Sequence, residues 1–245
     1  MQAKPYLRQI SLKREKIPDV EKYPFNIPAI RELNELEFHP DVTFLVGENG
    51  TGKSTLIEAI AVAMGFSAEG GTRNFQVSTA DTVSVLHQYL RVTKSFAKPK
   101  DYYFLRAESF FNVATYMDTT GYLEGYGDKS LHERSHGEAF MATLTIKLRG
   151  NGLYIFDEPE AALSPTRQMA ALSAIHELVN KGSQFIIATH SPILLAYPNA
   201  KIFILDDGGI FEIPYEQTEH YVVTKNFLNN HKKLLKTILS DDDDI

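Results

Sequence analysis

The segment Gly47–Ser54 reads GENGTGKS and matches the pattern G-x-x-x-x-G-K-[ST] without a mismatch. The apolar run Val42–Val46 precedes it as a short buried strand. Apolar residues at helical spacing follow from Leu56 to Met64, until Gly65. A strand, a glycine loop and a helix in this order allow backbone N–H groups to surround an anion. The segment therefore predicts an α/β fold with a nucleoside-triphosphate site.

Each part of this loop has an expected task. The amine of Lys53 would neutralise the β- and γ-phosphates, and the hydroxyl of Ser54 would be a ligand of Mg²⁺. We expect nucleotide contacts from all residues of the loop and the start of its helix: Gly47, Glu48, Asn49, Gly50, Thr51, Gly52, Lys53, Ser54 and Thr55.

Composition narrows the class of protein. A length of 245 residues with 43% hydrophobic content fits a single domain. The absence of a run of about 18 apolar residues and of a leader segment predicts a cytoplasmic protein without membrane insertion. The chain has no cysteine, which excludes disulfides and thiolate metal sites. A net charge of −6 argues against a surface that binds nucleic acid throughout, and allows only local basic patches.

Five parts of one domain follow from the pattern of strands, helices and turns. These are a β flap (1–41), the phosphate loop and first helix (42–66), a helical arm (67–150), an α/β core (151–214) and a C-terminal helix with an acidic tail (215–245). The expected elements beyond the loop are helices Ala80–Arg91, Glu138–Leu148, Pro165–Asn180 and Thr218–Leu239, strands Tyr102–Ala107, Leu153–Phe156 and Phe185–Ala188, and a hairpin with arms Lys201–Leu205 and Ile210–Ile213.

Two carboxylates end the apolar strand that begins near Gly152. Asp157 is expected to join the metal shell, and Glu158 to act as general base or to position the attacking water. A strand that ends in acidic residues is also common at ordinary loops. The presence of a phosphate loop in the same chain favours a catalytic role for these two carboxylates.

The order of four further motifs resembles that of ABC-type ATPases. They are SHGE from Ser135, DEPE from Asp157, ALSP from Ala162 and THSP from Thr189. The resemblance implies a P-loop NTPase of ABC-ATPase type, with a mostly parallel core sheet, an antiparallel β flap and a helical arm subdomain. It also implies that the protein is an ATPase that uses ATP and Mg²⁺.

In that family two heads pair head to tail across ATP. The resemblance therefore implies a homodimer in which the signature residues Ser135, Gly137 and Glu138 contact the nucleotide held by the partner. It also implies that His190 contacts the γ-phosphate region and reports its presence. By the same resemblance, Lys53, Glu158 and His190 form the catalytic set.

The DEPE and THSP motifs and the N-terminal flap resemble those of the ATPase heads in the RecF, chromosome-maintenance and overcoming-lysogenization-defect groups. Ser164 stands where transporter ATPases usually have an aspartate. This resemblance implies a molecular switch in DNA repair or antiphage defence that acts on DNA or on a separately encoded effector protein. The alternative is the nucleotide-binding subunit of a membrane transporter, docked through the helical arm.

Several positions have two open interpretations. Either Gln88 or Glu108 completes the magnesium shell, and the Glu108 region is favoured because it follows a strand. Tyr23 or Phe25 stacks on adenine or belongs to the core. Arg73 contacts DNA or is an ordinary surface residue.

Two further patterns are weaker. The segment His132–His136 fits H-E-x-x-H, but it follows a glycine-rich loop and overlaps Ser135, so we reject a zinc site. Basic residues cluster before the Tyr102 strand and in the last helix, where they would contact nucleic acid or simply be solvated. These residues are Arg91, Lys94, Lys98, Lys100, Lys225, Lys232, Lys233 and Lys236.

Overall fold

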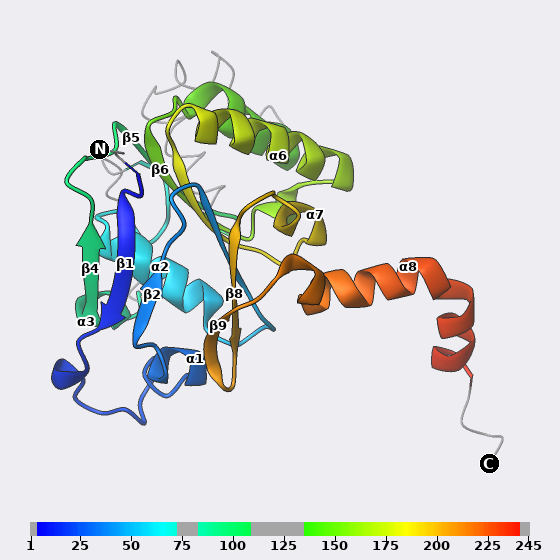
Figure 1. Cartoon of the computed structure of the whole chain (residues 1–245), viewed down its shortest axis with the longest axis horizontal. Coiled ribbons are helices and arrows are strands. Elements are labelled where there is room, and N and C mark those ends of the chain that lie inside the picture. The colour runs from blue at the N-terminus through cyan, green and yellow to red at the C-terminus, as the bar shows by residue number, and fades with distance from the viewer. Residues whose placement is uncertain (1–3, 73–82, 109–134, 241–245) are drawn as a thin grey trace.

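A six-stranded sheet forms the centre of the protein in the computed structural model, which describes residues 4–72, 83–108 and 135–240 (Figure 1). Its strand order is β5-β6-β7-β3-β8-β9. The first five strands are parallel, and β9 closes the edge as the antiparallel arm of a hairpin with β8. The strands are β3 (Val42–Val46), β5 (Asp101–Arg106), β6 (Gly152–Asp157), β7 (Gln184–Ala188), β8 (Lys201–Asp206) and β9 (Gly209–Glu212).

Apolar side chains cover both faces of this sheet. In β6, Tyr154 and Phe156 pack into one hydrophobic cluster, while Leu153 and Ile155 pack into another. Alternate residues of a strand point to opposite faces, so a run that is apolar throughout is buried on both sides. This is why the short apolar runs of the sequence become the central strands.

A second, antiparallel sheet of three strands has the order β2-β1-β4. It comprises β1 (Leu7–Leu12), β2 (Glu35–Glu37) and β4 (Leu90–Lys94). The first two strands are the predicted flap. The third corrects the predicted helix Ala80–Arg91: the described part of that segment has only the single-turn helix α3 (Leu86–Tyr89) before β4. Pairing with β1 supplies the backbone hydrogen bonds that a longer helix would have supplied.

Helices cover both faces of the six-stranded sheet. Helix α2 contacts β6 and β7 as well as β4 of the small sheet, and it therefore lies between the two sheets (Figure 1). Residues of α5 and α6 pack in the cluster on the opposite face. The helices are α1 (Pro28–Arg31), α2 (Lys53–Ala63), α5 (His136–Ala142), the π-helical turn η4 (Thr143–Lys147), α6 (Pro165–Asn180), α7 (Pro192–Leu195), α8 (Glu219–Ile238), and the 3-10 turns η1 (Arg14–Lys16), η5 (Pro159–Ala162) and η6 (Tyr215–Gln217).

The predicted bounds of α6 are confirmed. The Ser164 hydroxyl accepts a hydrogen bond from the Arg167 backbone N–H at 3.4 Å, and Pro165 occupies the first helical position. Gly182 follows the helix with φ +82°, in the left-handed region that glycine adopts without strain.

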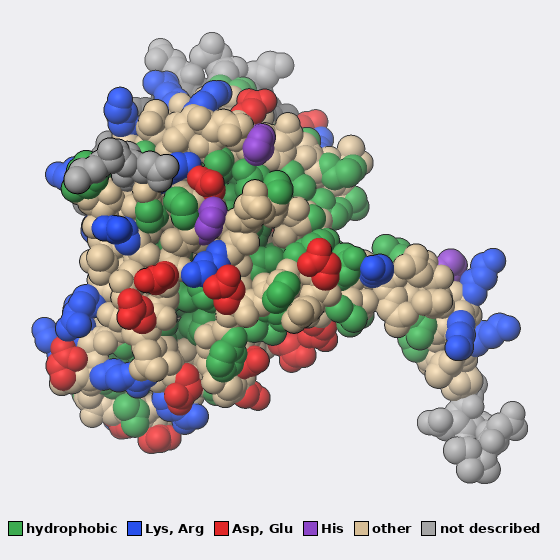
Figure 2. Space-filling model, in the orientation of Figure 1, with side chains coloured by type: hydrophobic (Ala, Val, Ile, Leu, Met, Phe, Trp, Pro, Cys, Tyr) green, Lys and Arg blue, Asp and Glu red, His purple; other side chains and the backbone are tan. Residues whose placement is uncertain are grey.

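Helix α8 stands out from the rest of the protein (Figure 1) and contains no buried residue. Asn230 interrupts its helical geometry with φ −125° and ψ 18°. Lysine side chains gather on its far half (Figure 2), where Lys232, Lys233 and Lys236 lie. Among the described helices, none is both long and apolar enough to cross a membrane.

Candidate active site

Three strands bring the predicted catalytic segments together. The neighbouring strands β6, β7 and β3 are parallel, and their carboxyl ends therefore lie at one edge of the sheet. The glycine loop follows β3, Glu158 follows β6, and His190 follows β7. The Thr189 N–H donates to the Leu45 carbonyl at 3.2 Å, and the Glu158 N–H donates to the Ala188 carbonyl at 2.9 Å. Ligands of open α/β sheets bind at this kind of edge.

The glycine loop is folded tightly against the end of β8. Gly47 has φ +149°, and a Cβ atom there would lie 2.3 Å from the Leu205 carbonyl oxygen. The buried amine of Lys53 donates hydrogen bonds to the backbone carbonyls of Gly47 at 2.8 Å and Glu48 at 2.7 Å. Burial lowers the pKa of Lys53, while Glu158 and Asp157 oppose that shift. The loop therefore holds a buried cation where the phosphates are expected.

Ser54 and Asp157 form an oxygen pair at the base of the loop. The Ser54 hydroxyl donates to Asp157 Oδ1 at 3.3 Å. Burial raises the pKa of Asp157 to about 7, and the neighbouring Arg106 opposes the rise. A hydroxyl beside a carboxylate is the kind of oxygen donor set that Mg²⁺ takes next to phosphates. These two residues therefore fit the expected ion.

Arg106 is a site residue that the sequence reasoning missed. Its guanidinium donates to Glu58 Oε2 at 2.6 Å, and its Nε lies 3.7 Å from Asp157 Oδ2. That Nε is buried and has no hydrogen-bond partner among the described residues. The only signal in the sequence is its place near the end of the predicted strand Tyr102–Ala107. Its pairing in register with Asp157 is a tertiary contact.

Glu108, the favoured candidate for the magnesium shell, contacts Arg106 at 3.6 Å, and its side chain is 82% exposed. The other candidate, Gln88, lies in α3, and its backbone carbonyl accepts a hydrogen bond from Lys13 at 3.0 Å. Its position in a helix is as predicted. The choice between them stays a prediction.

Glu158 and His190 face each other where β6 and β7 end. Glu158 Oε1 lies 3.7 Å from His190 Nε2. Glu158 has φ +52°, a left-handed conformation that is strained for a residue with a side chain and that occurs at functional sites. Glu160 holds the neighbouring loop, because its carboxylate accepts hydrogen bonds from the Thr189 hydroxyl at 2.7 Å and the His190 N–H at 2.5 Å.

A pocket of about 640 Å³ joins this pair to the glycine loop. It is lined by Glu48, Asn49, Glu158, His190, Glu219, His220, Val223 and Thr224. A pocket of about 520 Å³ shares Glu48, Glu219 and His220 with the first, and includes Gly47 and Thr51. The first turns of α8 therefore form part of the wall around the loop. Sequence reasoning gave these turns no role at the site.

The signature residues lie at the start of α5. The Ser135 hydroxyl accepts from the Glu138 N–H at 3.4 Å, and Glu138 Oε2 accepts from the Ser135 N–H at 2.9 Å. Arg167 of α6 donates to Ser135 Oγ and Glu138 Oε1, both at 3.3 Å. Neither pocket at the glycine loop has Ser135, Gly137 or Glu138 among its described lining residues.

Other predicted positions have separate outcomes. Phe25 is buried, 4% exposed, with its ring 4.9 Å from that of Tyr89 in an edge-on contact, and is thus a core residue. Tyr23 is 61% exposed, and its hydroxyl lies 3.3 Å from Thr55 Oγ1. Arg73 and most of the rejected zinc pattern, 132–134, lie outside the described residues.

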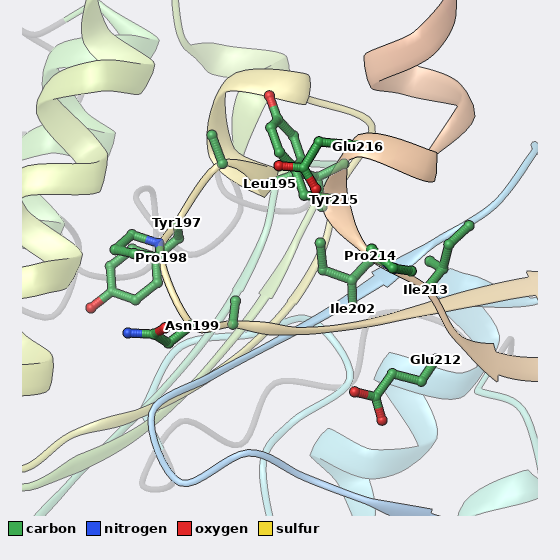
Figure 3. Close-up of a pocket in the computed structure, with 12 residues that line it drawn as sticks. Leu195, Tyr197, Pro198, Asn199, Ile202, Glu212, Ile213, Pro214, Tyr215 and Glu216 are labelled. Carbon is green, nitrogen blue, oxygen red and sulfur yellow. The ribbon is translucent and has the colours of Figure 1, made fainter.

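A third pocket, of about 570 Å³, lies between α7 and the end of β9 (Figure 3). Leu195, Ile202, Pro214 and Tyr215 are among its lining residues. Its described lining includes no residue of the glycine loop and neither Asp157 nor Glu158. It is separate from the predicted site.

Comparison with known proteins gives matches along most of the chain. Residues 25–132 match a family model described as "AAA domain", and residues 130–196 match one described as "AAA domain, putative AbiEii toxin, Type IV TA system". The ribose import ATP-binding protein RbsA of Chelativorans sp. is 27% identical over 210 residues, which cover 78% of this chain and 41% of that protein. The chain thus spans about two fifths of that relative.

Two further proteins are similar to this chain, one in sequence and one in structure. The hemin import ATP-binding protein HmuV of Pseudomonas aeruginosa is 25% identical over 203 residues, 74% of this chain and 78% of that protein. The SMC head domain from Thermotoga maritima superposes with a TM-score of 0.47 and 17% identity, over 87% of this chain and 99% of that one.

Proposed function

We propose that this chain, which matches AAA domain models over residues 25–132 and 130–196, is an ATP-driven switch: two copies close head to tail around Mg-ATP, and hydrolysis reopens them. The observation that carries the catalytic part is the pair of Glu158 and His190. The two side chains meet 3.7 Å apart at the rim of a pocket that also includes Glu48 and Asn49 of the glycine loop.

The roles of the residues follow from their positions. The N–H groups of the glycine loop and the amine of Lys53 bind the phosphates. Ser54 and Asp157 hold Mg²⁺, which neutralises phosphate charge when bound. The carboxylate of Glu158 accepts the proton of the attacking water, a role worth about 10² to 10⁴ in rate. His190 Nε2 is buried without a hydrogen-bond partner among the described residues, and the γ-phosphate supplies that partner.

The location of the signature residues supports the dimer. Ser135 is fixed on α5 by its capping interactions with Glu138 and by Arg167, away from the described lining of the loop pockets. A second copy in head-to-tail orientation would present Ser135 and Gly137 to the nucleotide. The buried ATP would then join the two chains.

The experiment is the solution mass of Glu158→Gln, measured by light scattering on a sizing column with and without Mg-ATP. We expect ATP to convert monomer to dimer, because binding is kept while hydrolysis is slowed. Ser135→Arg in the same background should prevent the dimer, while Ser240→Arg, at an exposed position just beyond α8, should not. A mass that does not change with ATP would overturn the switch.

We propose that the closing motion acts on DNA or on a separately encoded effector protein, in DNA repair or antiphage defence. The description of the second matched family names a toxin of a toxin–antitoxin system, which supports a separately encoded partner. The basic residues Arg91 and Lys94 of β4 and Lys232 of α8 are exposed and would contact phosphates if DNA is the target. The Glu158→Gln dimer, trapped with ATP, tests both targets. A protein that co-purifies with it identifies a protein partner. A salt-dependent band shift with DNA identifies nucleic acid as the target.

The second candidate is the nucleotide-binding subunit of a membrane transporter. The names of the relatives favour it, since RbsA and HmuV are import ATP-binding proteins. This candidate predicts that the chain sediments with membranes together with a permease. Recovery in the supernatant with a soluble partner would exclude it.

A further inference from the structure

His220, on the first turn of α8, contacts His190, one of the two residues of the proposed catalytic pair. Its Nε2 lies 3.0 Å from His190 Nδ1, with the two rings tilted by 55°. The residues are 30 positions apart in the sequence, so the start of α8 must be placed accurately for this contact to form. No motif of the chain includes His220.

The contact between the two rings contains one proton. Burial lowers the pKa of His190, with Lys53 adding to the effect and Glu158 opposing it. Burial also lowers the pKa of His220, helped by His190 and Lys53 and opposed by Glu219 and Glu160. Both rings are therefore neutral near pH 7.5, and each has one N–H and one lone pair. Either His220 donates to His190 or the reverse.

The opposite side of the His190 ring decides between these arrangements. His190 Nε2 lies 3.7 Å from Glu158 Oε1 and is buried. If His190 Nδ1 carried the proton, the lone pair of Nε2 would face the Glu158 carboxylate 3.7 Å away, and the two would repel. If Nε2 carries it, the N–H points toward the carboxylate, and His190 Nδ1 accepts from His220.

We infer that His220 is a positioning residue, which donates its Nε2–H to His190 Nδ1 and so fixes His190 as the tautomer with a proton on Nε2. The inference rests on the proposed function in one respect: the proton on Nε2 is what allows His190 to donate to the γ-phosphate. A lone pair at this position would repel that anion. The location of His220 also makes the tautomer depend on where α8 begins, so that a movement of α8 changes the donor at the site.

The first test needs neither nucleotide nor activity. Long-range ¹H–¹⁵N spectra of the histidine rings distinguish the two tautomers, and the loss of signals in His190→Gln assigns His190. We expect the wild type to show a protonated Nε2 and an unprotonated Nδ1 for His190. A proton on Nδ1 in the wild type would overturn the inference, whatever the variants do.

Three variants of His220 form a matched set. The amide of His220→Gln reaches the position of Nε2 and can donate to His190, whereas His220→Asn is equally polar but too short, and His220→Leu has no donor. We expect His220→Gln to keep the His190 tautomer, and the other two to give averaged ring signals. A single tautomer that persists in His220→Leu would show that another group fixes it.

Turnover then separates the two proposals. His220→Leu and His220→Asn should lower kcat about tenfold, the effect of one lost hydrogen bond near 1.4 kcal/mol, while His220→Gln should stay near the wild type. If the spectra behave as expected but all three variants turn over normally, His220 still sets the tautomer, and it is the role of His190 at the γ-phosphate that fails. If the spectra do not behave as expected, the inference about His220 fails, while the proposed ATPase function is unaffected.

Discussion

At the scale of the residue, hydrogen bonds to the glycine loop position the amine of Lys53, which is expected to bind the phosphates. Its amine donates to the Gly47 and Glu48 carbonyls, and an ammonium group has three donors. The remaining N–H is available to a phosphate oxygen. Because the amine is already buried, the charge needs little further desolvation when the nucleotide binds.

Replacement of this lysine tests the phosphate loop. We expect Lys53→Ala to weaken ATP binding by about tenfold to a hundredfold, as expected for the loss of one charge-assisted hydrogen bond of about 1.5–3 kcal/mol. Titration calorimetry measures the Kd. The control is Lys201→Ala, since the Lys201 amine pairs with Glu212 at 3.4 Å, at the amino end of β8. Equal ATP affinity of Lys53→Ala and wild type would refute the assignment of the loop.

His39 gives a pH-dependent contribution to stability away from the site. Its Nδ1 accepts hydrogen bonds from the Asp41 N–H at 3.1 Å and the Val42 N–H at 3.4 Å. Burial lowers the pKa of His39, while Asp41 opposes the shift. The unfolded chain therefore binds a proton more readily than the folded one. The stability from this group is complete above pH 6.5, its ordinary pKa, and is lost as the pH falls through the lowered value.

The variant His39→Asn separates this effect from other titrations, because the asparagine oxygen can accept the same N–H groups without a charge change. We expect its urea midpoint to fall less than that of the wild type between pH 7.5 and pH 5. His231→Asn, on the exposed half of α8, is the matched histidine control. Identical pH profiles for His39→Asn and wild type would contradict the argument.

At the scale of the element, strong local patterns were enough for much of the fold. The run before Gly47 and the run before Asp157 become β3 and β6, because they are apolar on both faces. The helix predicted over Ala80–Arg91 was wrong at its end. There Leu90 and Arg91 pair with β1, a partner about eighty positions away, and local periodicity contains no information on such a partner.

The start of α5 depends on a close approach to α6. A Cβ atom on Gly137 would lie 2.4 Å from Arg167 Nη1 and 2.8 Å from the Ala162 carbonyl oxygen. We expect Gly137→Ala to lower the free energy of unfolding by about 1–3 kcal/mol, the usual cost of overpacking. Adding Arg167→Ala removes the side-chain clash but not the backbone one, so part of the loss should return. Urea unfolding measures both variants, and an unchanged midpoint for Gly137→Ala would show that α5 moves aside without cost.

At the scale of the whole molecule, the sheet collects the site from segments far apart in the sequence. The motifs identified Lys53, Asp157, Glu158 and His190, and the parallel strands bring them to one edge. Arg106 and His220 could not be predicted in this way. Each reaches the site through a tertiary contact, one through the register of β5 with β6 and the other through the path of the chain into α8.

The projection of α8 leads to a prediction about the far end of the described chain. No residue of α8 is buried, and Asn230 breaks its helical geometry. A chain that stops at Asn230 should therefore keep its free energy of unfolding within about 0.5 kcal/mol, as for changes at exposed positions, and its affinity for ATP. By contrast, a chain that stops at Gln217 loses His220 and the Thr218 hydroxyl, which is buried and bonded to the Tyr215 carbonyl at 2.7 Å. That longer deletion should reduce both stability and turnover.

Urea unfolding at two protein concentrations measures the effect of each deletion. If the chain that stops at Asn230 is less stable, and more so at the higher concentration, the far half of α8 packs against a second copy. Its exposed Leu235 and Ile238 side chains would then belong to an interface between copies. If stability is equal at both concentrations, these side chains are free in the isolated protein, and any partner of α8 is a different molecule.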